Sequence, residues 1–299
     1  MSVRNSIRML NFWHFFFQLR PFLQRQRPLF VLNVGAQKSG TSWLRGTLKK
    51  QEVCNLGLMK EYHIWDQSVP KEILGNDFSA IASWMDGAKG ALRERMLQDE
   101  EFYFNYFKNL ILGERRITGD FTPSYSLLPE EELRRLTRKL VDVGFDVVVV
   151  FLVRDPVDRC WSAFRSNYRD LNQALPTEGL IKKFRAFYTS PEAVARTRYD
   201  EIISKLRRLE TRKKIFGSKG DVSVVIQGYE QMMTGEVDAI AKALRVEAVR
   251  LTNPQVYNAS PFQSLPESEV TACVSFFSKT YAYCRAQYPG ITRYWRNSV

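Results

Sequence analysis

The stretch FVLNVGAQKSGTSWL, residues 30–44, contains a glycine loop whose side chains suit an anion. Gly35 and Gly40 have the spacing of a Walker A loop, G-x-x-x-x-G-K-[ST], but Thr41 stands where that loop has its lysine. The lysine here is Lys38, inside the loop. Glycines allow backbone amides to converge on an anion, and Lys38, Thr41 and Ser42 add a charge and two hydroxyls. The pattern therefore predicts a phosphate-like ligand other than the β/γ-phosphates of a nucleoside triphosphate.

A second candidate is RDPVDRCWSAF, residues 154–164, which follows a buried apolar run. Arg154 stands at the end of that run, and Ser162 comes eight residues later. The carboxyl ends of parallel strands are where open α/β sheets bind ligands, and arginine can clamp a phosphate with two hydrogen bonds. Taken alone, the pair is more typical of an ordinary salt bridge and a surface serine.

The third candidate is MKEYHIWD, residues 59–66, in which Glu61, His63 and Asp66 have the spacing E-x-H-x-x-D. A carboxylate in a half-buried cleft can take the proton from an attacking hydroxyl or amine. Burial is expected to raise the pKa of Glu61 toward neutrality. For His63, a direct acid–base role and a structural role that orients Glu61 both remain open.

Together, GAQKSGTSWL and RDPVDRCWSAF resemble two motifs of the PAPS-dependent sulfotransferases, whose cofactor is 3′-phosphoadenosine 5′-phosphosulfate (PAPS). The loop is similar to their 5′-phosphosulfate loop, and the arginine–serine pair is similar to their 3′-phosphate site. RTRYDEIISKL is similar to the segment that brings a tyrosine near the adenine, although helix packing explains Tyr199 almost as well. The resemblance implies that the cofactor-binding residues are Gln37, Lys38, Ser39, Gly40, Thr41, Ser42, Arg154, Ser162 and Tyr199.

The E-x-H-x-x-D stretch is similar to the catalytic stretch of the glycan branch, especially of enzymes that act on heparan-like saccharides. The resemblance implies catalytic roles for Glu61 as general base, for Lys38 and for His63, with PAP as product and no metal requirement. TGDFTPSYSLLP, residues 118–129, resembles the E-K-[ST]-P-x-Y segment of that branch. Asp120 replaces its glutamate and Phe121 its lysine, which leaves Lys38 and Lys60 to supply positive charge.

The expected acceptor is a saccharide, a glycolipid or another hydroxylated small molecule. Residues 170–192 are expected to form a long loop or lid with short helical pieces along the acceptor cleft, where Lys182, Lys183 and Arg185 would suit an acidic substrate. A solvated basic helix face explains these three residues equally well. One alternative is a P-loop kinase or NTPase that uses Asp155 to hold Mg²⁺. A second alternative is a non-catalytic protein that binds anionic surfaces. Nucleic acid is not an expected partner.

The elements that must position these residues follow from apolar runs and helical periodicity. Three short apolar runs, 29–34, 146–153 and 222–226, are typical of buried parallel strands. Helices are expected at 41–50, 130–140, 156–168, 195–209, 235–245 and 267–286. Alternating strands and helices predict an α/β three-layer sandwich with a central parallel sheet and a P-loop-like phosphosulfate loop. Residues 29–299 are expected to form one domain.

Residues 1–28 are predicted to be a basic, amphipathic extension. They carry five arginines and no acid, and large apolar residues recur at helical spacing. A helix docked on the domain is the first interpretation, while a membrane-surface helix and a transit peptide remain alternatives. The net charge of +12 favours anionic partners. Four scattered cysteines predict free thiols in a reducing compartment, so we expect a cytoplasmic protein that contacts a membrane, if at all, only peripherally.

Overall fold

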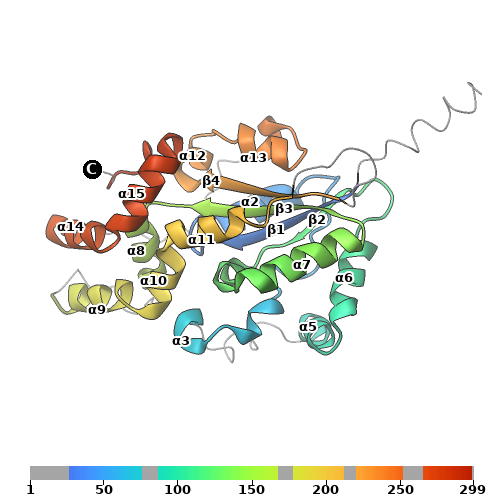
Figure 1. Cartoon of the computed structure of the whole chain (residues 1–299), viewed down its shortest axis with the longest axis horizontal. Coiled ribbons are helices and arrows are strands. Elements are labelled where there is room, and N and C mark those ends of the chain that lie inside the picture. The colour runs from blue at the N-terminus through green and yellow to red at the C-terminus, as the bar shows by residue number, and fades with distance from the viewer. Residues whose placement is uncertain (1–26, 76–86, 168–177, 212–219, 252–264, 298–299) are drawn as a thin grey trace, which may run out of the picture.

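The structure is a computed structural model that describes residues 27–75, 87–167, 178–211, 220–251 and 265–297. Four parallel strands form one sheet in the order β2-β1-β3-β4. Their bounds are β1 Leu29–Gly35, β2 Ile117–Asp120, β3 Asp146–Val153 and β4 Val222–Gly228. Figure 1 shows helices on both sides of this sheet. The α/β layered fold with a central parallel sheet that the sequence predicts is confirmed.

Helices alternate with these strands along the chain. The bounds are α2 Thr41–Lys49, α3 Lys71–Leu74, α5 Ala88–Gln98, α6 Glu100–Asn109, α7 Glu130–Asp142, α8 Pro156–Asn167, α9 Glu178–Tyr188, α10 Pro191–Thr197, α11 Tyr199–Arg207, α12 Tyr229–Met233, α13 Asp238–Ala243, α14 Glu267–Phe276, α15 Ser278–Gln287 and α16 Pro289–Thr292. In the part of the chain that the structure describes, the 3₁₀ helices η1 Trp65–Ser68, η2 Pro123–Leu127 and η4 Ala248–Leu251 fill short connections.

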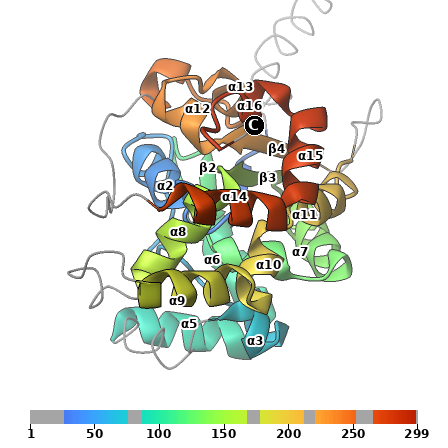
Figure 2. The ribbon, with the colours of Figure 1, turned by 90° about the vertical axis from the view of Figure 1, so that its left-hand side faces the viewer.

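Each face of the sheet buries its own set of apolar side chains, because successive residues of a strand point to opposite faces. Leu29 and Val31 of β1 pack with α2 and α13 in one cluster. Phe30 and Leu32 point the other way, into a larger cluster that includes residues of α6, α7, α8 and α11. In Figure 2, α8, α9 and α14 lie near one another, in agreement with the contacts among these helices.

Helix α7 illustrates how local sequence sets an element. Pro129 precedes it and Glu130, Glu131 and Glu132 fill its first turn, where negative charge complements the helix dipole. Its buried residues are Leu133, Leu136, Thr137 and Leu140, which recur at the helical period. The predicted start after Pro129 is confirmed.

Several predicted elements differ from the structure. The helix expected at 267–286 is interrupted at Phe277, and the one expected at 195–209 becomes α10 and α11, separated at Arg198. Within 170–192, where a loop with short helical pieces is expected, α9 is a helix of 11 residues and is followed by the start of α10. Residues 168–177 lie outside the described residues, as do residues 1–26 of the predicted extension 1–28. Strand β2 was not predicted. Among the described residues, none belongs to a helix long and apolar enough to cross a bilayer.

Candidate active site

All four strands are parallel, so their carboxyl ends lie at one edge of the sheet, and two of the predicted motifs, the glycine loop and the one that begins at Arg154, follow the ends of β1 and β3. The chain enters the glycine loop after β1, the segment 121–126 after β2 and Arg154 after β3. We call the loop 35–42 with Arg154 the loop side. We call the segment 59–66 with 118–126 the acid side.

The glycine loop is compact and its backbone requires its glycines. Gly35 and Gly40 have φ values of 140° and 91°, and Lys38 also has a positive φ of 69°. A Cβ on Gly40 would lie 2.9 Å from the ring of Tyr229, so a side chain there would displace the loop. Helix α2 begins at Thr41 with no side chain capping its amides. Amides at a helix N-terminus favour an anion in front of them.

Ser39 and Arg154 hold unused donors on the loop side. Ser39 is fully buried, and its Oγ has no hydrogen-bond partner among the described residues. The Nε of Arg154 is buried and likewise lacks a partner there. A buried polar group without a partner is costly in a folded protein, so these two atoms favour a ligand that would accept hydrogen bonds from them.

Arg154 joins two motifs that are far apart in the sequence. Its Nη1 donates a hydrogen bond of 3.1 Å to the carbonyl oxygen of Lys38, inside the loop. Its guanidinium carbon lies 4.6 Å from the ring centroid of Tyr229, which also packs against Gly40. Ser162 is half-buried on α8, two turns beyond Arg154. The structure thus brings Arg154 and the loop together at the sheet edge.

Tyr199, the predicted adenine-side tyrosine, is held by contacts within the fold. Its side chain is fully buried, and its hydroxyl donates to the carbonyl oxygen of Arg154 at 3.1 Å. Its ring packs at 5.7 Å from Phe151 of β3. Because no face of the ring is accessible, this geometry favours a structural role in which Tyr199 fixes the backbone at Arg154.

On the acid side, His63 lies between two carboxylates. Its Nδ1 is 2.7 Å from Asp66 Oδ2, and its Nε2 is 3.3 Å from Glu61 Oε2. Asp66 is fully buried and also accepts a hydrogen bond from the Oγ of Ser124. The other oxygen of Glu61, Oε1, is 2.8 Å from the Nζ of Lys60. The spacing E-x-H-x-x-D therefore produces a connected chain of polar side chains.

The charges of this chain follow from its contacts. Burial opposes the charged imidazole, but hydrogen bonds to Asp66 and Glu61 raise the pKa of His63 to about 9. Burial also opposes ionisation of Glu61, yet the hydrogen bond from His63 and the charge of Lys60 lower its pKa to about 2. The expected rise of the Glu61 pKa is therefore wrong, because two adjacent cations outweigh burial. At neutral pH Glu61 is ionised and His63 is protonated.

A second buried acid, Asp120, supports this arrangement from the end of β2. Asp120 accepts hydrogen bonds from Thr122 Oγ1 (2.6 Å), Tyr103 (3.0 Å) and Tyr125 (3.1 Å). Burial raises the pKa of its carboxyl to about 6. The adjacent Phe121 is buried with the other face of the sheet, away from Asp120.

The hydroxyls bound to Asp120 in turn hold the backbone of the acid side. The amide of Tyr62 donates to Thr122 Oγ1 at 2.9 Å, and the amide of Ile64 donates to the Tyr125 hydroxyl at 3.1 Å. These contacts fix the chain on both sides of His63, which has a positive φ of 53°. The segment T-P-S-Y, already present in the sequence motif, therefore provides the support for Glu61 and His63.

Further support comes from Arg45 and Arg93, which sequence reasoning missed. Arg45 donates to the carbonyl oxygen of Met59 at 2.6 Å, and Arg93 donates to that of His63 at 2.9 Å. No motif surrounds Arg93, which lies 30 residues from His63. Arg45 follows the glycine loop on α2 and so links the loop side to the acid side. The two sides also meet where the carbonyl of Pro123 packs against Gly35.

Asp155, the candidate magnesium ligand of the kinase alternative, has structural partners. Its Oδ1 accepts hydrogen bonds from the Val157 amide at 2.9 Å and from the Tyr281 hydroxyl at 2.8 Å. Its Oδ2 accepts one from the Asn297 amide at 3.1 Å. These contacts attach the start of α8 to the C-terminal segment. Among the described residues, no group of three or more histidine, cysteine or acidic side chains could hold a metal ion.

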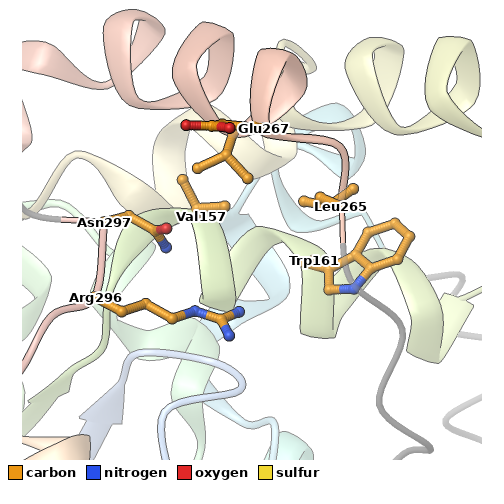
Figure 3. A pocket seen from close by; sticks show the side chains of 7 residues that line it. Val157, Trp161, Leu265, Glu267, Arg296 and Asn297 are labelled. Carbon is orange, nitrogen blue, oxygen red and sulfur yellow. The ribbon is translucent and has the colours of Figure 1, made fainter.

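A cavity of about 280 Å³ lies between α8 and α14, beside the C-terminal segment. Figure 3 shows Glu267 on one side of it and Arg296 on another, with Trp161 and Leu265 near each other on a third. Its lining residues are Val157, Trp161, Leu265, Glu267, Val270, Arg296 and Asn297. None of them is a predicted site residue, and Arg296 forms an ion pair with Asp158.

Comparison with solved structures identifies the fold. The chain is similar to a structure described as the crystal structure of a sulfotransferase from Alicyclobacillus acidocaldarius, with 18% sequence identity and a TM-score of 0.54. The match covers 87% of this chain and 95% of that one. No protein-family model and no curated protein matches the sequence. The central four-stranded parallel sheet flanked by helices is therefore the sulfotransferase fold.

Proposed function

We propose that this protein is a PAPS-dependent sulfotransferase that moves a sulfuryl group to a hydroxyl or amine of an acceptor. The observation that carries the proposal is the hydrogen bond from Arg154 to the Lys38 carbonyl, which unites the two predicted cofactor motifs at one edge of the sheet. The likeness in fold to a sulfotransferase supports it. The unused donors of Ser39 and Arg154 fit a ligand with several anionic oxygens.

On the loop side, each residue has a role in binding. Lys38, Thr41, Ser42 and the first amides of α2 bind the 5′-phosphosulfate, and Gln37, Ser39 and Gly40 complete the loop. Arg154 and Ser162 bind the 3′-phosphate, which distinguishes PAPS from ATP. PAPS supplies the sulfuryl group, and negative charge develops on the oxygen that links sulfur to phosphate. Lys38 and the loop amides are preorganised donors for that charge.

On the acid side, Glu61 accepts the proton of the acceptor group as that group attacks sulfur. His63 is charged and held by Asp66, so it orients the Glu61 carboxylate and remains protonated at neutral pH. We assign His63 a positioning role for this reason. The acceptor is a saccharide, a glycolipid or another hydroxylated small molecule, as in the glycan branch that the motif resembles.

The proposed cellular compartment and membrane contact are based on the cysteines and on the N-terminal extension. All four cysteines, Cys54, Cys160, Cys273 and Cys284, are buried and free, which suits the reducing cytoplasm. The basic N-terminal extension is proposed to dock on the domain or to contact an anionic membrane peripherally.

The test compares three nucleotides by thermal shift: PAP, 5′-AMP, which lacks the 3′-phosphate, and ATP with Mg²⁺. A ligand that binds only the folded protein raises its melting temperature, and at equal concentration the tighter ligand raises it more. We expect PAP to stabilise the protein most. Stronger stabilisation by ATP with Mg²⁺ would favour the kinase alternative, and no stabilisation by any nucleotide would favour a non-catalytic binder. Labelled PAPS screened against glycans, glycolipids and phenols then identifies the acceptor.

A further inference from the structure

In the structure, both carboxylate oxygens of Glu61, the general base that the proposed function requires, are already paired with a basic side chain. Oε1 of Glu61 is 2.8 Å from Lys60, and Oε2 is 3.3 Å from His63. Against the effect of burial, these two partners lower the pKa of Glu61 to about 2. A carboxylate with such a low pKa takes a proton weakly, and an acceptor hydroxyl must come within hydrogen-bond distance of one of these oxygens.

The two partners differ in how easily they can leave. The His63 side chain is 8% exposed and is bound to the fully buried Asp66, and its backbone carbonyl is held by Arg93. The Lys60 side chain is 50% exposed and sits on a flexible four-carbon chain. Exposed ion pairs contribute little free energy, whereas a buried pair is costly to break. Lys60 is therefore the partner that an incoming molecule can displace.

Displacing Lys60 has two consequences for the site. Glu61 loses one of the cations that depress its pKa and becomes a stronger base beside the acceptor. Lys60 meanwhile needs a new anion, and the length of its side chain limits how far its ammonium group can move, so that anion must lie in the neighbourhood of Glu61. Arg45, whose charge also acts on Glu61, is fixed to the Met59 carbonyl at 2.6 Å and cannot make the same movement.

We infer that Lys60 is a specificity-determining residue that covers Glu61 in the free enzyme and releases it to an acceptor carrying a carboxylate or sulfate beside the reacting hydroxyl. The incoming anion exchanges with Glu61 as the partner of Lys60, so the exchange conserves charge. A neutral acceptor has no anionic group that could pair with Lys60. Lys60 therefore stays on the Glu61 carboxylate, and the acceptor hydroxyl cannot reach that oxygen. This inference rests on the proposed function, because it assigns Glu61 as the general base.

The test uses two probes that differ in one carboxylate, 4-nitrophenyl β-glucuronide and 4-nitrophenyl β-glucoside, with PAP present. The chain has two histidines, His14 and His63, so a His14→Gln background leaves one imidazole NMR signal. We expect the glucuronide to raise the pKa of His63, because Lys60 moves away, and the glucoside to leave it unchanged. Lys60→Gln should raise this pKa without any probe and abolish the response, while Lys60→Arg should retain it.

The control is Lys279→Gln, which removes an exposed lysine from α15 and should behave as the parent does. Equal responses to the two glycosides, no response to either, or a response that survives in Lys60→Gln would each overturn the inference. Sodium sulfate is a third probe. If sulfate shifted the His63 pKa as much as the glucuronide does, Lys60 would bind any small free anion. That result would overturn a role in recognising the acceptor.

Turnover provides a second readout, with labelled PAPS as donor. We expect kcat/KM to favour the glucuronide about tenfold, equivalent to ~1.4 kcal/mol, and the ratio to approach one in Lys60→Gln. The NMR response decides the question even when neither glycoside is turned over. Thermal stabilisation by PAP distinguishes failure of the proposed function from failure of this inference. If PAP does not stabilise the protein, the proposed function is contradicted. If PAP stabilises it but neither glycoside shifts the His63 pKa, only the role of Lys60 is contradicted.

Discussion

The loop side and the acid side of the site differ in how their polar atoms are used. On the loop side, buried donors of Ser39 and Arg154 have no partner among the described residues. On the acid side, Glu61 and Asp120 accept hydrogen bonds on both oxygens. An anionic ligand on the loop side would supply the missing hydrogen-bond acceptors. On the acid side the Oδ1 of Asp66 is also buried without a partner among the described residues, but the proposed base Glu61 is paired on both oxygens and must exchange a partner before it can react.

This difference indicates that the two sides have separate tasks, nucleotide binding and proton transfer, and that they are built in different ways. The loop side is made from one continuous loop and one strand end, so its geometry depends mainly on backbone conformation. The acid side depends on side chains from α2, α5, α6 and the turn after β2. We therefore expect substitutions on the loop side to change nucleotide binding, and substitutions on the acid side to change turnover or its pH dependence.

The largest expected effect comes from Glu61→Gln. Glutamine keeps the size of the side chain but cannot take a proton, so we expect kcat to fall about 10²- to 10⁴-fold. The affinity for PAP should not change, because Glu61 lies on the acid side. Labelled-PAPS turnover and PAP titration measure the two quantities, with the exposed Glu131→Gln on α7 as a control for lost charge. Near-normal turnover in Glu61→Gln would remove Glu61 from its role.

The loop side was largely predictable from sequence and the acid side only in part. The apolar runs of β1, β3 and β4 and the glycine loop are local features, and the structure confirms their positions. Strand β2 escaped prediction because ITGD is short and contains residues that disfavour strands. Its pairing with β1, from Ile117 opposite Leu29 to Asp120 opposite Leu32, is a property of the assembled sheet.

The pKa of Glu61 was predicted in the wrong direction for a similar reason. Sequence reasoning supplied burial, which raises a carboxyl pKa. It did not supply the close contacts of Glu61 with His63 and Lys60, which lower the pKa by more than burial raises it. Arg93 supports His63 from 30 residues away and lies in no motif. Contacts of this kind depend on tertiary structure, whereas the spacing E-x-H-x-x-D already placed Glu61, His63 and Asp66 together.

The next effect tests the buried charge of the acid side through Asp120→Asn. Burial raises the pKa of Asp120 from 3.8 to about 6, so the folded state binds this proton more tightly than the unfolded state does. The contribution of Asp120 to stability therefore falls as the pH rises from about 4 to about 6, by ~3 kcal/mol. Asparagine does not titrate, so the variant should lack this loss.

Urea unfolding of both proteins at several pH values measures this contribution. The difference in unfolding free energy between Asp120→Asn and the parent should shift in favour of the variant as the pH rises, because other titrating groups cancel. A difference that is constant between pH 4 and pH 7 would show that Asp120 titrates normally, and would weaken the contrast between the two sides.

A smaller effect tests the loop side through Arg154→Gln. The hydrogen bonds of a charged group to a phosphate are worth about 1.5–3 kcal/mol, so PAP affinity should fall about ten- to hundredfold. The affinity for 5′-AMP should change little, because it lacks the 3′-phosphate. Titration of both nucleotides gives the ratio, and the exposed Arg138→Gln on α7 controls for the lost charge. Equal losses for both nucleotides would mean that Arg154 acts by holding the Lys38 carbonyl.

The smallest effect concerns Ser124, whose hydroxyl donates to Asp66 behind His63. Ser124→Ala removes one buried hydrogen bond of ~1 kcal/mol, so His63 should orient Glu61 less well and kcat should fall several-fold with PAP affinity unchanged. Ser126→Ala is a matched control, since its hydroxyl donates to the Pro123 carbonyl at 3.1 Å in the same turn and is equally buried. If both variants lowered kcat equally, general loosening of the turn would explain the loss, and the chain from Ser124 through Asp66 to His63 would have no specific part in turnover.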